Sequence, residues 1–138
     1  MKKIIFCFSL ALIALNAISQ IVLPLDFEQA PANYVFTDFA GGTVSVIPNS
    51  QPVGINTSAQ VAKMIKFSGQ TYGGSFIALS SPIDFSVNKT FKMKVFAPRA
   101  GVRVLLKVEN NSNPGIFFER EVSTTVANAW EEISFNFS

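Results

Sequence analysis

Apolar and polar residues alternate along much of the chain beyond residue 20, with a period of two rather than the about 3.6 residues of an amphipathic helix. The clearest runs cover residues 91–95, 102–109 and 133–137, and weaker ones cover 22–28, 34–39, 43–48, 62–67, 75–79 and 116–122. Such alternation is typical of strands that turn one face to a core and the other to water. The pattern therefore predicts short strands and no amphipathic helix.

Turn-forming residues separate these runs, at Gly41-Gly42, Gly73-Gly74, 48–52, 98–101 and 110–115. Residues 98–101 are short enough to predict a hairpin between the two strong strands on either side. Many short strands with turns between them predict an all-β fold, an antiparallel β-sandwich or jelly roll. We expect Met93, Val104 and Phe135 to face its core, to which the phenylalanines beyond residue 20, 12 of the 14 in the sequence, contribute much of the apolar surface.

The first 19 residues have a different pattern. Lys2 and Lys3 precede an apolar run at 4–18, which ends in the small residues that a signal peptidase reads before Gln20. This arrangement predicts a signal peptide at 1–19 and no membrane span in the mature chain, which is one domain at 20–138. We therefore expect a secreted protein, either released outside the cell or kept at the cell surface.

Net charge and the absence of certain residue types exclude several classes of function. Lys2 and Lys3 account for the whole formal charge of +2, so the predicted mature chain is neutral and shows no footprint for nucleic acid. The sequence has no histidine, and its one cysteine, Cys7, falls in the predicted signal peptide. Imidazole-based catalysis, a disulfide and a thiolate nucleophile are thus excluded from the mature domain.

The C-terminal end leaves one question open. The sequence ends inside the alternating run at 133–137, with no turn or polar tail after it. A sandwich without a closing strand would expose an edge and apolar core surface. We expect either a strand-terminated domain or a sandwich that lacks its final strands, with further strands or domains belonging to a longer protein.

Several segments together resemble the β-jelly-roll carbohydrate-binding modules of the family 4/9 and family 22 type. The matching segments, in chain order, are 25–28 (LDFE), 56–65, 70–76 (QTYGGSF), 83–95 and 130–135 (WEEISF). The resemblance implies a secreted bacterial module that binds polysaccharide or oligosaccharide without catalysis, beside a glycoside hydrolase domain or alone. Modules of this type usually continue to a Phe-Asp-Asp-like segment, which this sequence does not contain.

Asp26 and Glu28 are the candidate metal ligands. They flank Phe27 in a predicted strand, so both carboxylates point to the same side, where oxygen ligands can hold a hard cation. The resemblance implies a structural calcium ion here, with Glu28 as a ligand and Asp26 as a weaker second. The alternative is a pair of solvated surface acids.

The candidate carbohydrate-binding residues are Tyr72, Arg103, Lys107 and Glu119. Tyr72 stands beside two glycines, which can leave its ring exposed for stacking on a sugar. Arg103, Leu105, Lys107 and Glu109 share one face of a predicted strand, and Glu119, Glu121 and Phe117 extend such a face on the next one. A solvent-facing sheet has the same composition, and Tyr72 can equally lie over the sandwich edge. Trp130 is interpreted as a packing anchor rather than as a sugar platform.

The sequence therefore predicts non-catalytic carbohydrate binding. Glu119 and Glu121, whose β-carbons lie roughly 7 Å apart along a strand, could approach the separation of a retaining glycosidase pair. Such a pair flanks a sugar within a cleft, which a larger scaffold builds. The alternatives are a structural or adhesion module without a sugar site and an ancillary N-terminal fragment of a secreted glycoside hydrolase.

Overall fold

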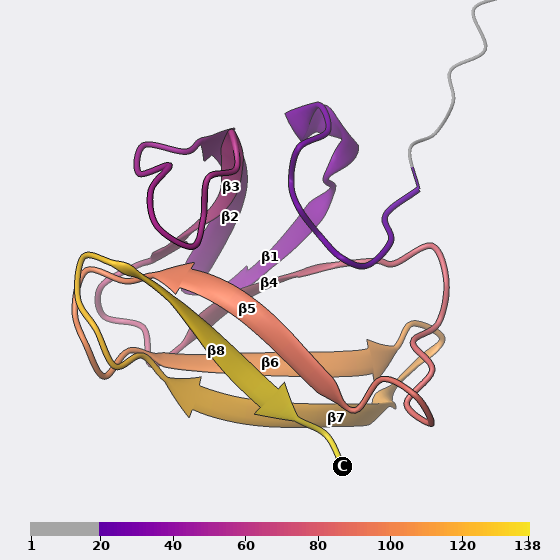
Figure 1. The fold of residues 1–138 in the computed structure, drawn as a ribbon. Coiled ribbons are helices and arrows are strands. Elements are labelled where there is room, and N and C mark those ends of the chain that lie inside the picture. The colour runs from indigo at the N-terminus through magenta and orange to yellow at the C-terminus, as the bar shows by residue number, and fades with distance from the viewer. Residues whose placement is uncertain (1–19) are drawn as a thin grey trace, which may run out of the picture.

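A computed structural model describes residues 20–138, and the predicted signal peptide at 1–19 lies outside the described residues. Figure 1 shows the strands as arrows, with a short helical turn at the upper edge of the molecule. The elements are η1 (Pro31–Asn33), β1 (Phe36–Ala40), β2 (Gly42–Pro48), β3 (Gln60–Lys66), β4 (Gly73–Ile77), β5 (Thr90–Phe96), β6 (Arg103–Asn110), β7 (Asn113–Ser123) and β8 (Trp130–Asn136). No helix in the described part of the chain is long and apolar enough to cross a membrane.

The strands pair as four antiparallel ribbons, β1 with β4, β2 with β3, β5 with β8, and β6 with β7. The all-β antiparallel sandwich that the sequence predicts is confirmed, although these pairs do not by themselves define a jelly roll. Figure 1 shows the β5–β8 ribbon crossing the β6–β7 ribbon, with the first four strands forming the other half of the molecule.

The core lies between the β5–β8 and β6–β7 ribbons. Ile133, Phe135 and Phe137 are its buried residues, and Phe135 is fully buried. Met93 and Val104 pack against this cluster from the two ribbons, as the alternation predicts. The alternation therefore builds this core, because every second side chain of a strand points to the same face and these side chains are apolar.

The predicted strand at 22–28 is wrong. This segment is irregular, and Phe27 has a φ of 61°, in the left-handed region that an extended strand residue does not adopt. The ring of Phe27 lies 5.3 Å from that of Tyr34 and 6.4 Å from that of Phe36, measured between centroids. The apolar residue of the segment thus packs on the chain that leads into β1, without a partner strand.

The predicted hairpin at 98–101 is also wrong, because this segment connects two ribbons. The buried residue Thr124 holds this segment in place. Its Oγ1 accepts the Val102 N–H at 3.0 Å and donates to the Arg99 carbonyl at 3.2 Å. Gly101 N–H also bonds to the Thr124 carbonyl. These contacts fix the segment to the end of β7, so β6 pairs with β7 rather than with β5.

Trp130 links the two halves of the molecule. Its Nε1 donates to the Gln51 carbonyl at 2.7 Å, in the connection between β2 and β3, and its ring lies 5.5 Å from that of Phe96. These contacts fit the interpretation of Trp130 as an anchor.

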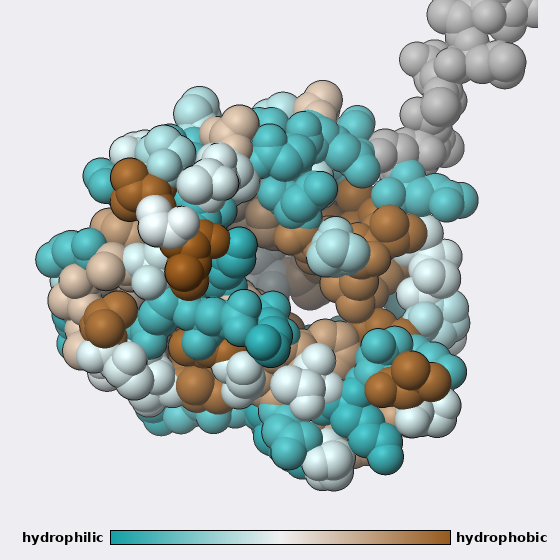
Figure 2. Space-filling model, viewed as in Figure 1, coloured by the Kyte–Doolittle hydropathy of each residue, from teal (hydrophilic) through white to brown (hydrophobic). Residues whose placement is uncertain are grey.

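Figure 2 shows a hollow between the halves with apolar side chains on its walls. Large apolar side chains such as Val35 and Ile116 stay exposed.

Glu131 joins β8 to the segment after β7. Its carboxylate accepts the Thr125 hydroxyl at 2.8 Å, the Thr125 N–H at 2.9 Å and the Val126 N–H at 3.3 Å. These hydrogen bonds, the Thr125 hydroxyl foremost, hold the pKa of Glu131 below its ordinary value of 4.5. Hydrogen bonds from hydroxyl groups first, and from backbone N–H groups, also lower the pKa of Asp38 and of Asp84 from 3.8.

We expect the protein to lose stability as the pH falls below about 4.5. A carboxyl group with a lowered folded-state pKa stabilises the fold above its unfolded-state pKa, and this contribution disappears as the pH falls through the folded-state value. Glu131→Gln should therefore reduce the difference between the urea midpoints measured at pH 6 and pH 3. Glu119→Gln, with the same charge change on the exposed part of β7, is the control. Equal pH dependence in both variants would contradict the role of Glu131.

Candidate functional site

Three of the predicted binding residues lie on one side of the β6–β7 ribbon. This side, which we name the outer face, consists of Arg103, Leu105, Lys107, Glu109, Phe117, Glu119, Glu121 and Ser123. Each β6 member stands directly opposite a β7 member, with Lys107 opposite Glu119 and Arg103 opposite Ser123. The alternating residues of β6 pack on the core, and this burial orients the outer face toward solvent.

An exposed aromatic ring occupies one end of the outer face. Phe117 is 47% exposed and stands opposite Glu109. Lys107 Nζ lies 4.4 Å from the Phe117 ring centroid and 2.6 Å from Glu109 Oε2. The ammonium group therefore faces the ring and a carboxylate together, and both contacts favour a fixed position for the Lys107 side chain. A partly exposed ring and charged hydrogen-bonding groups thus lie side by side.

The other end of the outer face is charged. Arg103 Nη1 lies 3.8 Å from Glu121 Oε2, and both side chains are well exposed to solvent. Between the two ends lie Leu105, which is 52% exposed, and Glu119. The guanidinium and ammonium groups can donate hydrogen bonds and the carboxylates can accept them. With Phe117 and Leu105 as apolar surface, this arrangement can bind a ligand that has both C–H faces and hydroxyl groups.

Tyr72 lies elsewhere in the fold. It directly precedes β4, which pairs with β1, and its side chain is 66% exposed. Its carbonyl accepts the N–H of Gly41 at 3.1 Å, so the backbone at this position is held in place. The structure thus exposes the ring, as a stacking role requires, but does not bring Tyr72 to the outer face with Arg103, Lys107 and Glu119.

Asp26 and Glu28 do not lie on a strand, in contrast to the prediction. Asp26 Oδ1 accepts the Glu28 N–H at 3.1 Å, and Glu28 Oε1 accepts the N–H of Gln60 at the start of β3, at 3.2 Å. One oxygen of each carboxylate is thus bonded to the backbone. Residues 20–138 contain no cluster of three or more acidic, histidine or cysteine side chains arranged to hold a metal. These two acids alone fall short of the six to eight oxygen ligands that calcium takes.

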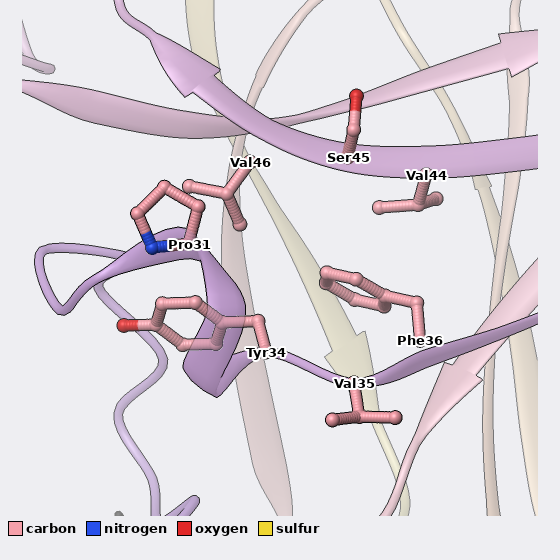
Figure 3. Close-up of a pocket in the computed structure, with 7 residues that line it drawn as sticks. All are labelled: Pro31, Tyr34, Val35, Phe36, Val44, Ser45 and Val46. Atoms are coloured by element: carbon pink, nitrogen blue, oxygen red, sulfur yellow. The ribbon is translucent and has the colours of Figure 1, made fainter.

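A cavity of about 360 Å³ lies between η1, the start of β1 and β2. Figure 3 shows Val44, Val46 and Phe36 on its walls, while the Ser45 hydroxyl points away from them. The Tyr34 hydroxyl, also at this cavity, accepts the Gln29 N–H at 3.2 Å. Of the side chains that line this cavity, only those of Tyr34 and Ser45 carry polar atoms, so few side-chain groups are available to orient a ligand with many hydroxyls.

Phe117 and Glu109 acquire their place on the outer face through the register of the hairpin. The β6–β7 pairing shifts between Glu109 and Asn110, where Asn110 pairs with Asn113 but Glu109 pairs with Phe117. A regular hairpin across this turn would pair Glu109 with Pro114. The irregularity therefore brings an aromatic ring opposite a carboxylate and beside Lys107. The loop signal at 110–115 indicates a turn, but only the pairing reveals this contact.

Comparison of the chain with models of protein families, with curated proteins and with solved structures finds no match.

Proposed function

We propose that this protein is an exported, non-catalytic module that binds polysaccharide or oligosaccharide on the outer face of the β6–β7 ribbon. The observation that carries the proposal is the half-exposed ring of Phe117 beside Lys107 and Glu109. A pyranose ring has apolar C–H surface on its faces and hydroxyl groups around its rim. An aromatic ring with charged donors and acceptors next to it complements both parts of such a ligand.

The arrangement of charges supports a neutral ligand. Arg103 and Lys107 provide two cations on the outer face, and Glu109, Glu119 and Glu121 provide three anions. Because the two signs alternate over a short distance, no strong field of one sign develops to attract nucleic acid or an acidic polymer. Besides their ion pairs with one another, these side chains can form hydrogen bonds to uncharged hydroxyl groups, which favours neutral glycans such as β-glucans and xylans.

The absence of catalysis is part of the proposal. Glu119 and Glu121 point to the same side of β7, and Glu121 lies near Arg103. Both are exposed, and the cavity beside η1 involves neither of them. A glycosidase pair needs carboxylates on opposite sides of an enclosed sugar. Two acids on the same side of one exposed strand fit ligand recognition better than bond cleavage.

Phe117→Ala should weaken retention of the protein in an affinity gel that contains a soluble β-glucan or xylan, by about tenfold in Kd, as expected for the loss of about 1–1.5 kcal/mol of ring stacking. The matched control is Phe67→Ala, which removes an equally exposed ring, 50% accessible, outside the outer face. Tyr72→Ala tests the second predicted stacking residue in the same gel.

The pattern of the three variants decides between the sites. Loss of retention with Phe117→Ala alone supports the outer face, whereas loss with Tyr72→Ala alone moves the site to the start of β4. Equal retention of all variants and wild type in gels with and without glycan would contradict sugar binding. A structural or adhesion module would then be favoured, since exposed apolar residues such as Val35 and Ile116 suit protein contacts.

Calcium binding at Glu28 and Asp26 stays a prediction of the resemblance. If Glu28 helps to hold calcium, the melting temperature should be higher in millimolar calcium than in chelator, and Glu28→Gln should remove the difference. Asp84→Asn, which changes another exposed carboxylate, is the control. Identical melting curves in calcium and chelator would remove the ion from the proposal and leave Glu28 as an acceptor for the Gln60 N–H.

A further inference from the structure

The β6 strand has a free edge. Within residues 20–138, β6 pairs on one side with β7 and with no other strand. Its eight residues contain neither proline nor glycine, and they alternate regularly between core and solvent. The backbone N–H and C=O groups on the second edge of such a strand form a template for another extended chain.

Charge, a proline or short length sets the other strands apart from β6. β3 and β5 each carry two lysines and no acid, and β7 and β8 each carry two glutamates, offset by one arginine in β7 and by no base in β8. Antiparallel self-pairing tends to place charges of one sign opposite each other on β3, β5 and β8, which is destabilising. β2 ends in a proline, and β1 and β4 are short. In contrast, β6 begins with Arg103 and has Glu109 near its end.

The geometry points to a two-fold symmetric dimer in which β6 pairs with β6 of a second copy in antiparallel orientation, with Leu106 opposite Leu106. In this register Arg103 stands opposite Glu109 of the second copy, twice because of the symmetry. Val104 stands opposite Val108 of the second copy on the core side. At both ends of the pairing a charged residue thus stands opposite a residue of the other sign, and each apolar residue on the core side stands opposite another apolar residue.

Charge also selects this register over its neighbours. A shift by two residues in one direction places Arg103 opposite Lys107 of the second copy, and a shift in the other direction places Lys107 opposite itself. Both shifts put cations side by side, which antiparallel pairs avoid. A shift by one residue would turn the core side of one copy toward the solvent side of the other. The register centred on Leu106 remains.

The dimer would join the two outer faces into one surface. The sheet order becomes β7–β6–β6–β7, with both cores on the same side. Leu105, now 52% exposed, would lie opposite Lys107 of the second copy, whose aliphatic stem can cover it. This inference goes beyond the proposed function, because it depends on the edge of β6 and holds whether or not the outer face binds a glycan.

Sedimentation equilibrium of the purified protein, over concentrations up to about 1 mM, tests the dimer. We expect a reversible monomer–dimer equilibrium. Arg103→Glu and Glu109→Arg should each raise the dimer Kd by about tenfold or more, because each replaces two attractive pairs with two repulsive ones. The double variant Arg103→Glu/Glu109→Arg should restore association. Lys94→Glu, a charge reversal on β5, is the control and should associate like the wild type.

The double variant makes the test specific. A single variant that associates less because its fold is damaged would not recover when a second charge is reversed, and circular dichroism melts of all variants check the fold directly. A protein that stays monomeric over the whole concentration range would overturn the inference. So would a dimer whose Kd is the same in all four variants, since its interface would then lie away from the edge of β6.

Discussion

Phe135→Ala is expected to lower the free energy of unfolding by about 3–5 kcal/mol, a large part of the about 5–15 kcal/mol that stabilises a small domain. Phe135 is fully buried between the β5–β8 and β6–β7 ribbons and pairs with Phe91 across the ribbon. Ile133 and Phe137, its neighbours on the same side of β8, are the other buried members of this cluster. Because the cluster has so few buried residues, few neighbouring side chains can move into the cavity that the substitution leaves.

Urea unfolding followed by circular dichroism measures this effect. Phe117→Ala, which removes the same ring from an exposed position on β7, is the matched control and should cost about 1 kcal/mol or less. Phe135→Leu should lie between wild type and Phe135→Ala, since it keeps most of the apolar volume. If Phe135→Ala and Phe117→Ala unfold at the same urea concentration, the core between the two ribbons is not where the stability of this protein resides.

Gly73→Ala is expected to have the second large effect, because a methyl group at this position has no room. A Cβ built on Gly73 would lie 2.3 Å from the carbonyl carbon of Gly41 and 2.5 Å from the backbone nitrogen of Gly42. All three nearest atoms belong to the backbone, which cannot move aside as a flexible side chain can. The beginning of β4 would have to separate from the chain between β1 and β2. We expect a loss of about 2–4 kcal/mol or failure to fold.

Gly115→Ala is the matched control, since Gly115 also lies in a strand, β7, and its nearest neighbour would be the Asn113 side chain at 3.2 Å. That side chain can rotate away, so the substitution should change the urea midpoint little. If Gly73→Ala has no larger effect than Gly115→Ala, the close contact between Gly41 and Gly73 is not required for folding. Limited proteolysis of the Gly73→Ala variant should show early cleavage near β4, because the first four strands would open before the core around Phe135.

The alternation of apolar and polar residues predicts the strands of this protein well where one face of the strand is buried in the core. The alternation around Met93, Val104 and Phe135 corresponds to β5, β6 and β8, and these three residues face the core. The prediction fails at 22–28, where Phe27 turns into the left-handed region and packs on Tyr34 instead of facing a sheet. Alternation over a few residues does not distinguish these outcomes, because it describes side-chain polarity and not backbone dihedral angles.

The candidate site was predictable only in part. Alternation places Arg103 and Lys107 on the same side of one strand, and the register adds Glu119 opposite Lys107. The contact between Lys107 and Phe117 depends on the shift in pairing at the end of β6, which no feature of the sequence indicates. Tyr72, which the sequence pattern offers as part of the same binding function, lies just before β4 in the other half.

By itself, the order of apolar and polar residues determined that this chain forms strands, which side of β5, β6 and β8 is apolar, and where most of the turns lie. Each of these properties depends on residues that are close in sequence. Only the tertiary structure decided which strands pair, as when Thr124 holds the connection after β5 against the end of β7. Strand pairing depends on contacts between distant segments, such as the close approach of Gly41 and Gly73, and their fit is a property of the folded chain.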